Sequence, residues 1–216
     1  MKKTSLKALP ESELARYQTL QSGNNCTLHA ISAVLNLLCG LTILPSELVE
    51  EVNRLWWHGH FYRILPNYAV TPPMQARFVN YLSKTRHLPV SARLLHTSSE
   101  ILRNLPNDED IAAMVTLYWL PGQAPAIYHG FRGVNYNQAK GMGGHTMLFA
   151  SYDPDHLTDG TTPTPWGFIN SWAEGSTNLF WMEDQSFRKS WNFPLPRLGR
   201  NPTVLISMSN LKSLAA

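Results

Sequence analysis

The apolar positions in the first half of the chain follow a helical spacing. In QSGNNCTLHAISAVLNLL, residues 21–38, a polar segment leads directly into apolar residues that recur every three or four positions. Asn24 or Asn25 can cap the start of this helix and Gly40 can end it. The pattern therefore predicts a helix over residues 26–39.

Three more helices are predicted before residue 105. One follows Pro45-Ser46 and carries apolar residues along one side. Another opens with Thr71-Pro72, where a capping hydroxyl precedes a proline in the first turn. A short fourth helix is expected to begin at Ser98 or Ser99.

The second half has a different pattern. Short runs rich in β-branched and aromatic residues alternate with turn dipeptides such as Pro121-Gly122 and Asp159-Gly160. Between the first two runs lies an irregular stretch at residues 120–144, and a loop of this length is usually functional or disordered. The runs predict five strands, at residues 111–119, 145–152, 166–172, 178–182 and 203–208.

Together these elements predict an α+β fold. We expect a single domain over residues 1–216, with a mainly helical lobe at 1–110 packed against a mainly β lobe at 111–216. The strands of the second lobe are expected to form an antiparallel sheet. A cleft between the two lobes is the natural place for a binding or catalytic site.

Composition and charge narrow the possible functions. Of the 216 residues, 44% are hydrophobic and 15% charged, which is typical of a globular protein with a substantial core. The formal net charge is +3 and no basic stripe interleaved with aromatic residues is visible, so nucleic-acid binding is not expected. No apolar stretch is long enough to span a membrane, so no membrane partner is expected.

The two cysteines, Cys26 and Cys39, fall at opposite ends of the first predicted helix. They would lie about 20 Å apart there, beyond the reach of a disulfide, so both thiols are expected to be free. Free thiols and the lack of a signal-peptide core near the N-terminus favour a cytoplasmic protein. Delivery by a signal-independent secretion machine is compatible with the same sequence.

Cys26 is the first candidate for chemistry. A thiolate at a helix N-terminus is stabilised by the helix dipole, and a nearby imidazolium stabilises it further. A cysteine nucleophile also needs a polar group that orients the imidazole and donors that face the oxyanion. Taken alone, a cysteine in this position is more often a small buried residue.

The second half of the chain offers the missing partners. His145 opens a predicted strand directly after Gly143-Gly144, where small residues would let a substrate approach the imidazole. Asn170 lies within GFINSW, on the strand expected to pair with the His145 strand. Gln21 lies just before the cysteine and can place a side-chain amide beside it.

This set of residues resembles the papain superfamily of cysteine peptidases. WGFINSW is similar to the signature around the superfamily's catalytic asparagine, and GGHTMLFASYD is similar to its histidine strand. NLFWMEDQSF resembles the aromatic-rich strand that follows, whereas residues 40–110 match no signature. The resemblance implies a papain-like fold, with a helical lobe packed against a barrel-like β lobe.

The resemblance also implies a role for each residue. Cys26 would be the nucleophile, and His145 would be the general base and then the acid that protonates the leaving amine. Asn170 would orient the imidazole, and Trp172 would cover their hydrogen bond from water. Gln21 would donate to the oxyanion together with the backbone N–H of Cys26. The substrate would be a protein or peptide, and no metal or organic cofactor is implied.

The chain departs from the family's pattern near the cysteine. Gln21 is five residues from Cys26, one fewer than in papain, so Asn24 or Asn25 is a further candidate for contacts with the oxyanion or the substrate. Thr27 stands where the family usually has an aromatic residue. Only 25 residues precede Cys26, too few for an inhibitory propeptide, so any restraint is expected from a regulatory partner or inhibitor protein, from the 120–144 loop or from scarcity of substrate.

Other polar and aromatic residues have simpler interpretations. Cys39 is expected to be a packing residue and His29 a helix-surface histidine. His58 and His60 could share a strand face, but no further cluster has the spacing of a zinc site, so no metal is expected. Three tryptophans are expected in the core or between the lobes: Trp56, Trp57 and Trp191.

The sequence thus predicts a papain-like cysteine peptidase that hydrolyses peptide bonds through an acyl-enzyme. Two alternatives stay open. The same residues could transfer the acyl group of a glutamine side chain, as in a glutamine deamidase or a transglutaminase-like enzyme. The chain could also be a catalytically silent binding module with the papain fold, although an intact Cys–His–Asn set favours an enzyme.

Overall fold

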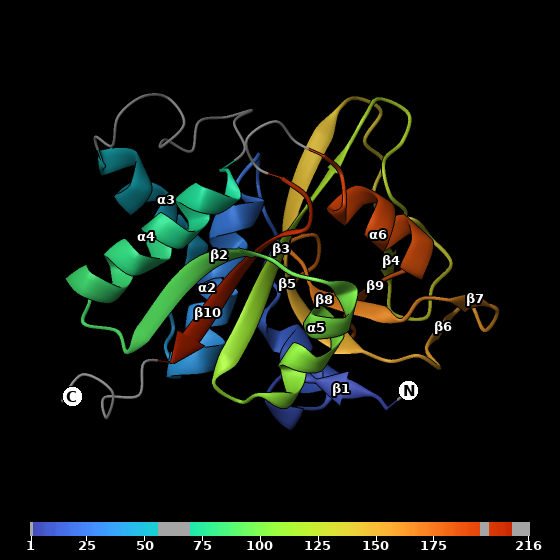
Figure 1. Cartoon of the computed structure of the whole chain (residues 1–216), viewed down its shortest axis with the longest axis horizontal. Helices are drawn as coiled ribbons and strands as arrows, with labels where there is room; N and C mark the ends of the chain where they lie inside the picture. The colour runs from blue at the N-terminus through green and yellow to red at the C-terminus, as the bar shows by residue number, and fades with distance from the viewer. Residues whose placement is uncertain (1, 56–69, 195–198, 209–216) are drawn as a thin grey trace.

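One large antiparallel sheet with helices on both of its faces organises the structure, a computed structural model that describes residues 2–55, 70–194 and 199–208 (Figure 1). The strand order is β2-β10-β3-β5-β8-β9-β4, and β1 pairs with the end of β5. A separate two-stranded hairpin pairs β6 with β7.

The strands and helices have the following bounds. The strands are β1 Thr4–Ser5, β2 Val90–His96, β3 Ile111–Trp119, β4 Tyr128–His129, β5 Gly143–Tyr152, β6 Leu157–Thr158, β7 Thr162–Pro163, β8 Trp166–Ile169, β9 Phe180–Met182 and β10 Pro202–Met208. The α-helices are α1 Glu11–Leu14, α2 Cys26–Cys39, α3 Pro45–Arg54, α4 Pro72–Thr85, α5 Ser99–Asn104 and α6 Asp184–Trp191.

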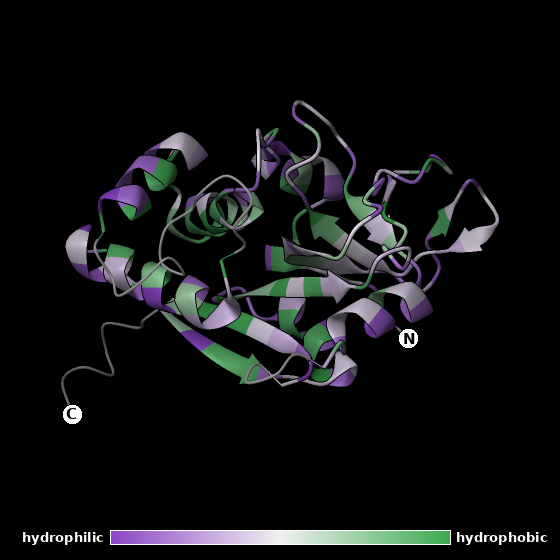
Figure 2. Cartoon of the chain, turned by 90° about the horizontal axis from the view of Figure 1, so that it is seen from above, coloured by the Kyte–Doolittle hydropathy of each residue, from purple (hydrophilic) through white to green (hydrophobic). Residues whose placement is uncertain are grey.

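Alternate residues of the central strands supply two hydrophobic cores, one on each face of the sheet. Ala112 and Met114 of β3 belong to the core that α2, α3 and α4 cover, whereas Val115 and Leu117 belong to the core that α6 covers. Because both faces are covered, β3 is a nearly continuous apolar run in the sequence. In Figure 2 green and purple residues alternate along the helices, and green segments lie within the strands of the sheet.

The predicted α+β fold class is confirmed, and the predicted helices lie where the sequence placed them. The first runs from Cys26 to Cys39, and Gly40 ends it in the left-handed conformation with φ of 65°. The next begins at Pro45, and the third begins at Pro72. The fourth begins after Ser98, whose hydroxyl accepts a hydrogen bond from the backbone N–H of Ile101 at 3.2 Å.

Three features of the fold differ from the prediction or add to it. The sheet is open, with β2 and β4 at its two edges, so the expected barrel-like closure is wrong. Residues 90–96 were expected among helices but form β2, since they pair along their whole length with β10. Helix α6 was not predicted, because its short sequence DQSFRKSW has few apolar residues. Trp56, Trp57, His58 and His60 lie outside the described residues.

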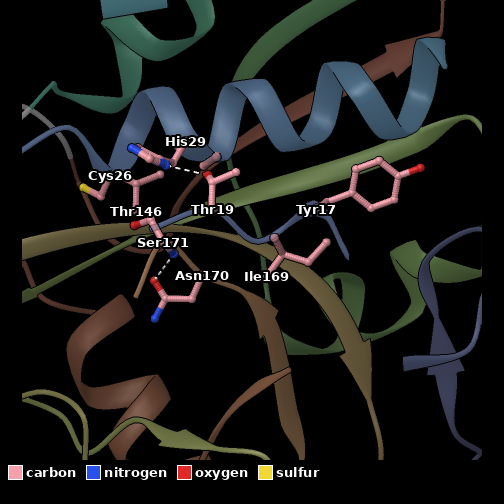
Figure 3. A pocket seen from close by; sticks show the side chains of 9 residues that line it. Tyr17, Thr19, Cys26, His29, Thr146, Ile169, Asn170 and Ser171 are labelled. Atoms are coloured by element: carbon pink, nitrogen blue, oxygen red, sulfur yellow. Dashed lines mark hydrogen bonds between the residues drawn. The ribbon is translucent and has the colours of Figure 1, made fainter. Parts of the chain in front are cut away.

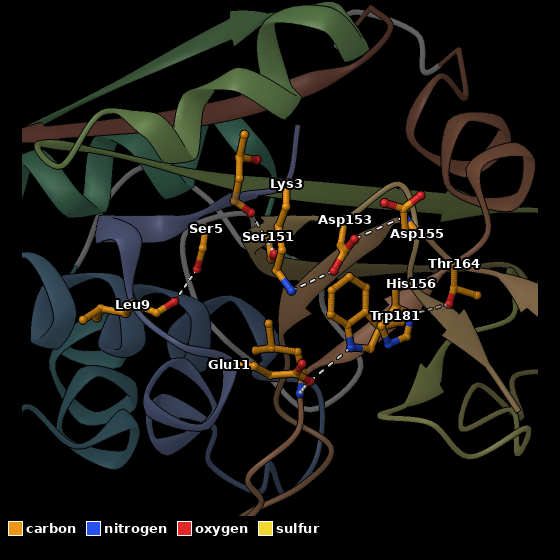
Figure 4. Close-up of polar contacts among 12 residues, drawn as sticks. Lys3, Ser5, Leu9, Glu11, Ser151, Asp153, Asp155, His156, Thr164 and Trp181 are labelled. Atoms are coloured by element: carbon orange, nitrogen blue, oxygen red, sulfur yellow. Dashed lines mark hydrogen bonds and ion pairs between the residues drawn. The ribbon is translucent and has the colours of Figure 1, made fainter. Parts of the chain in front are cut away.

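The N-terminal segment is fastened to the sheet by polar contacts (Figure 4). The Lys3 ammonium lies 2.7 Å from Asp153 Oδ2, and Thr4 of β1 pairs with Tyr152 of β5. Glu11 Oε1 accepts a hydrogen bond from the indole N–H of Trp181 at 3.2 Å. These contacts lead the chain across β5 and β9 towards the start of α2.

Helix α2 packs directly against β5, so the N-terminus of the helix and the first residues of the strand lie close together. None of the helices in the described part of the chain combines the length and the apolarity needed to cross a bilayer. The fold therefore brings Cys26 and His145, far apart in sequence, to one place.

Candidate active site

Cys26 is the first residue of α2, so its thiol lies at the positive end of the helix dipole. The first backbone N–H groups of a helix have no partner within the helix. One of them, that of Thr27, forms a hydrogen bond with the Cys26 sulfur, as does the backbone of Thr146. The position therefore favours a thiolate.

His145 lies between Cys26 and Asn170. Its Nε2 lies 2.6 Å from Asn170 Oδ1, and because an amide oxygen only accepts, Nε2 carries the proton and donates it. The thiol of Cys26 also forms a hydrogen bond with His145. With Nε2 occupied, Nδ1 is the ring nitrogen left to face the sulfur, and it is in the tautomer that can accept a proton.

The two thiols of the chain shift in opposite directions. Burial alone raises the pKa of the Cys26 thiol, but the charge and hydrogen bond of His145, with the backbone hydrogen bonds, outweigh burial and lower the pKa below its ordinary value. At the other end of α2, burial raises the pKa of Cys39, and the charge of Lys7 only partly opposes it. Cys26 is therefore the thiol that ionises more readily.

Hydrogen bonds of its side-chain oxygen and of its backbone N–H hold Asn170 in place. Its Oδ1 also accepts the backbone N–H of Ser171 at 2.7 Å, and its own backbone N–H donates to Gln18 Oε1 at 3.4 Å. The amide of Gln18 donates in turn to the carbonyl of Asn178 at 3.0 Å. The Nδ2 of Asn170 is buried and has no partner in the described part of the chain. The bonds therefore orient Oδ1 towards the imidazole.

Trp172 stacks on His145, with ring centroids 4.3 Å apart and an interplanar angle of 21°. The indole covers one face of the imidazole beside the hydrogen bond to Asn170. An adjacent aromatic surface of this kind excludes water from a hydrogen bond and strengthens it. The structure thus brings Cys26, His145, Asn170 and Trp172 into one constellation.

Gln21 and Asn25 lie near the site, but their described hydrogen bonds go to other groups than Cys26 and His145. The backbone N–H of Gln21 donates to the Ser171 carbonyl at 2.8 Å, its Oε1 accepts from the Ser171 hydroxyl, and its Nε2 donates to the Gly23 carbonyl at 2.9 Å. One hydrogen of that amide remains for a substrate. Asn25 precedes α2 without a side-chain capping bond, and its Oδ1 is buried and unpartnered within the described residues. Neither residue has a described hydrogen bond to Cys26 or His145.

Gly143 and Gly144 have a packing role that the sequence did not indicate. A Cβ added to Gly143 would lie 2.6 Å from Cζ2 of Trp119, and one added to Gly144 would lie 3.0 Å from Cδ1 of Tyr118. The two rings of β3 lie across the glycines of β5, a pairing that compensates for the missing side chains. The predicted contact of these glycines with a substrate stays a prediction.

The sequence did not indicate Gln75, which lies behind the site in a cluster of buried polar groups. Its Nε2 lies 3.0 Å from Thr146 Oγ1 and 3.1 Å from Thr116 Oγ1. The hydroxyl of Thr27 donates to the Thr146 hydroxyl at 3.3 Å and lies 3.4 Å from the Gln75 amide. Since Thr27 follows the nucleophile candidate and Thr146 follows His145, this cluster connects the two elements that carry them.

Tyr118 was also missed. It faces Gly144 across the β3–β5 ladder, one residue before His145. Burial raises the pKa of Tyr118, and the charge of Cys26 raises it further, so the phenol stays protonated near the thiol. A phenol that stays neutral can donate a hydrogen bond. Its signal in the sequence, an aromatic residue at the end of an apolar run, does not differ from that of a core residue.

His29 is buried, so the expectation of a helix-surface histidine is wrong. Its Nδ1 lies 2.6 Å from the Thr19 hydroxyl, and burial lowers its pKa to about 4. His29, Thr19 and Tyr17 line a cavity of about 10 Å³ beneath Cys26, whose sulfur points away from Thr19 and Tyr17 (Figure 3). This cavity has room for a single water and none for a substrate.

Within the described residues, no group of three or more His, Cys, Asp or Glu side chains is arranged to hold a metal ion. The chemistry that the constellation can perform rests on the thiol, the imidazole and the amide. A buried thiolate beside an imidazole oriented by an amide oxygen is an arrangement for nucleophilic attack on an acyl carbon.

Solved structures of two known proteins have a similar fold. No family model and no curated protein sequence matches the chain. A solved structure of a C39-like peptidase from Bacillus anthracis is similar, with a TM-score of 0.55 and 12% identity over 95% of this chain and 98% of that one. Procathepsin B S9 from Trypanosoma congolense is similar with a TM-score of 0.50 and 12% identity, over 94% of this chain and 77% of that one. The chain thus has the papain-like fold of these cysteine peptidases.

Proposed function

We propose that this protein is a papain-like cysteine peptidase with Cys26 as nucleophile, His145 as base and Asn170 as orienting residue. One observation carries the proposal: His145 bonds to Asn170 through Nε2 and lowers the pKa of Cys26 from its other side. Each residue of the set thereby acts on the next one, as nucleophilic catalysis requires.

The reaction follows from the positions of these groups. The Cys26 thiolate attacks the carbonyl carbon of a peptide bond, and the oxyanion that forms accepts from the backbone N–H of Cys26 and from Gln21. His145 then gives its proton to the leaving amine as the C–N bond breaks, which leaves a thioester. Water, deprotonated by His145, hydrolyses the thioester and releases the carboxylic acid and the thiolate.

Incubation of the full chain with a mixture of peptides of known sequence tests this function. New peptide termini, detected by mass spectrometry, are expected with the wild type and with Cys39→Ala, but not with Cys26→Ala. Loss of activity in both variants, or in neither, would contradict the assignment of Cys26.

The same experiment separates the alternatives. A mass increase of about one unit on glutamine without new termini would indicate deamidation by the same acyl-transfer chemistry. Unchanged peptides together with a Cys26 that resists alkylation near neutral pH would contradict the peptidase proposal and favour a binding module.

A further inference from the structure

A second cavity, of about 220 Å³, lies near His145 at the end of β3. In the β3–β5 ladder Leu117 pairs with His145 and Tyr118 pairs with Gly144, so the cavity begins one residue pair from the imidazole. Tyr118 lines the cavity and also lies within electrostatic reach of Cys26. A substrate bound at Cys26 can therefore place a neighbouring group in this cavity.

Trp119 is one of the residues that line the cavity, and its indole carries an unused hydrogen-bond donor. Its side chain is only 5% exposed, and its indole Nε1 is buried without a partner in the described part of the chain. A buried N–H that lacks an acceptor costs free energy. A ligand with an acceptor oxygen would satisfy it.

The residues that line the cavity carry a positive charge and no negative charge. Lys189 of α6 is the only charged residue among those that line the cavity, and within the described residues it forms no ion pair. The nearby carboxylate of Asp184 forms an ion pair with the neighbouring residue Arg188, at 2.8 Å. The remaining lining supplies polar groups and aromatic surface, from Tyr118, Gln123, Ser186 and Phe193.

We propose that this cavity is a substrate subsite that binds a carboxylate, with Lys189 supplying the positive charge and the Trp119 indole N–H a directed hydrogen bond. The aromatic rings would contact the apolar stem of the group that carries the carboxylate. The carboxylate belongs either to an Asp or Glu side chain or to the C-terminus of a peptide. The subsite rests on the peptidase function proposed above, because it selects what reaches Cys26.

The experiment observes the cavity directly, without turnover. Two-dimensional NMR of the full chain with ¹⁵N-labelled tryptophan shows the indole N–H groups, and Trp119→Phe identifies the signal of Trp119. N-acetylglutamic acid α-amide, N-acetylglutamine α-amide and N-acetyl-leucine are titrated to tens of millimolar. These three probes present a side-chain carboxylate, no carboxylate and a terminal carboxylate.

We expect a carboxylate probe to shift the Trp119 indole signal and the glutamine probe to leave it unchanged. Lys189→Gln should weaken that binding about fivefold, whereas Lys84→Gln, which removes an exposed charge on α4, should not weaken it. The probe that shifts the signal identifies the source of the carboxylate. No shift, an equal shift with the glutamine probe, or a binding affinity that Lys189→Gln leaves unchanged would overturn the proposal.

If Trp119→Phe does not fold, the Lys189→Gln comparison still tests the subsite, because one indole signal should then respond to the probe with about fivefold weaker affinity. Alkylation of Cys26 near neutral pH is measured on the same samples. Slow alkylation would contradict the proposed function, whereas fast alkylation without a carboxylate response would contradict the subsite alone.

Discussion

At the scale of single residues, the reactivity of Cys26 depends on the balance between burial and His145. Burial raises the pKa of the thiol and is the largest single influence, yet the pKa is lowered because His145 and the backbone hydrogen bonds act together. Removing the imidazole leaves burial largely unopposed. The two influences can therefore be separated by substitution.

His145→Ala should raise the pKa of Cys26 above its ordinary value. The rate of alkylation by iodoacetamide at pH 6–7 should fall by about tenfold or more, since each unit of pKa removes about nine tenths of the thiolate. Mass spectrometry of the labelled peptide measures the rate. The control is His96→Ala, which replaces an exposed histidine on β2. An alkylation profile that is the same in His145→Ala and in the wild type would contradict the pairing of His145 with Cys26.

Asn170→Ala should affect turnover more than thiol reactivity. Asn170 touches the imidazole and not the sulfur, so its loss disorders His145 without removing the charge beside Cys26. We expect peptide cleavage to fall by about one to two orders of magnitude and alkylation to fall by less. Equal losses in both assays would show that Asn170 acts on the thiol itself.

At the scale of the elements, the site depends on how α2, α4, β3 and β5 meet. The Gln75 Nε2 of α4 lies within hydrogen-bond distance of hydroxyls of β3 and β5 and of the Val70 carbonyl, which is 3.0 Å away, and all of these groups are buried. Buried polar groups of this kind stabilise the fold only while each has a partner. The cluster therefore couples packing to the geometry of the site.

Gln75→Leu should lower the free energy of unfolding by about 1–3 kcal/mol, because it leaves buried acceptors unpaired. Urea unfolding measures the change, and Gln185→Leu at an exposed position of α6 is the matched control. If the cluster also positions His145, Gln75→Leu should slow the alkylation of Cys26. Unchanged stability would show that the cluster contributes nothing.

Gly143→Ala should destabilise the protein by about 1–3 kcal/mol, since the new Cβ would lie 2.6 Å from the Trp119 ring. Gly141→Ala is the matched control, because no atom lies within 4 Å of its added Cβ, and we expect it to change stability by less than about 0.5 kcal/mol. Thermal unfolding compares the two variants. Equal effects would contradict the packing role of Gly143.

The elements differ in how far the sequence could predict them. Helix α2 and strand β3 were predictable because one carries a helical apolar spacing and the other an unbroken apolar run. Strand β2 was not, since it is an edge strand with exposed residues whose partner, β10, follows much later in the chain. The local sequence of an edge strand contains little of the information that fixes its pairing.

The same limit applies to the site. Cys26, His145 and Asn170 were found through short motifs, and the hydrogen bond between the last two spans only neighbouring strands. Gln75 contacts Thr146 across 71 positions of sequence, and nothing near either residue indicates the other. Contacts between segments that only the fold brings together cannot be predicted from the local sequence.

At the scale of the whole molecule, two buried histidines couple the fold to pH. Burial lowers the pKa of both His29 and His156 to about 4. His156 stacks on Trp181 at 3.7 Å, at the end of the sheet where the N-terminal segment is fastened. In the unfolded chain each histidine titrates near pH 6.5, so between about pH 6.5 and 4 the unfolded state binds more protons than the folded state.

The free energy of unfolding should therefore fall as the pH falls from about 6.5 to 4, by about 1–2 kcal/mol for each histidine. His156→Gln should remove part of this slope, and His87→Gln at the surface should leave it unchanged. Urea unfolding at several pH values measures the slope. A free energy of unfolding that does not change over this range would contradict the burial of both rings in neutral form.

The most direct test of the account is the pH dependence of alkylation at the two thiols of the wild-type chain, followed by mass spectrometry. Cys26 should react with iodoacetamide at pH values well below those of an ordinary thiol, whereas Cys39, whose pKa is raised, should react slowly in the same sample. Alkylation of Cys26 only above about pH 8, alongside Cys39, would contradict the activated thiolate.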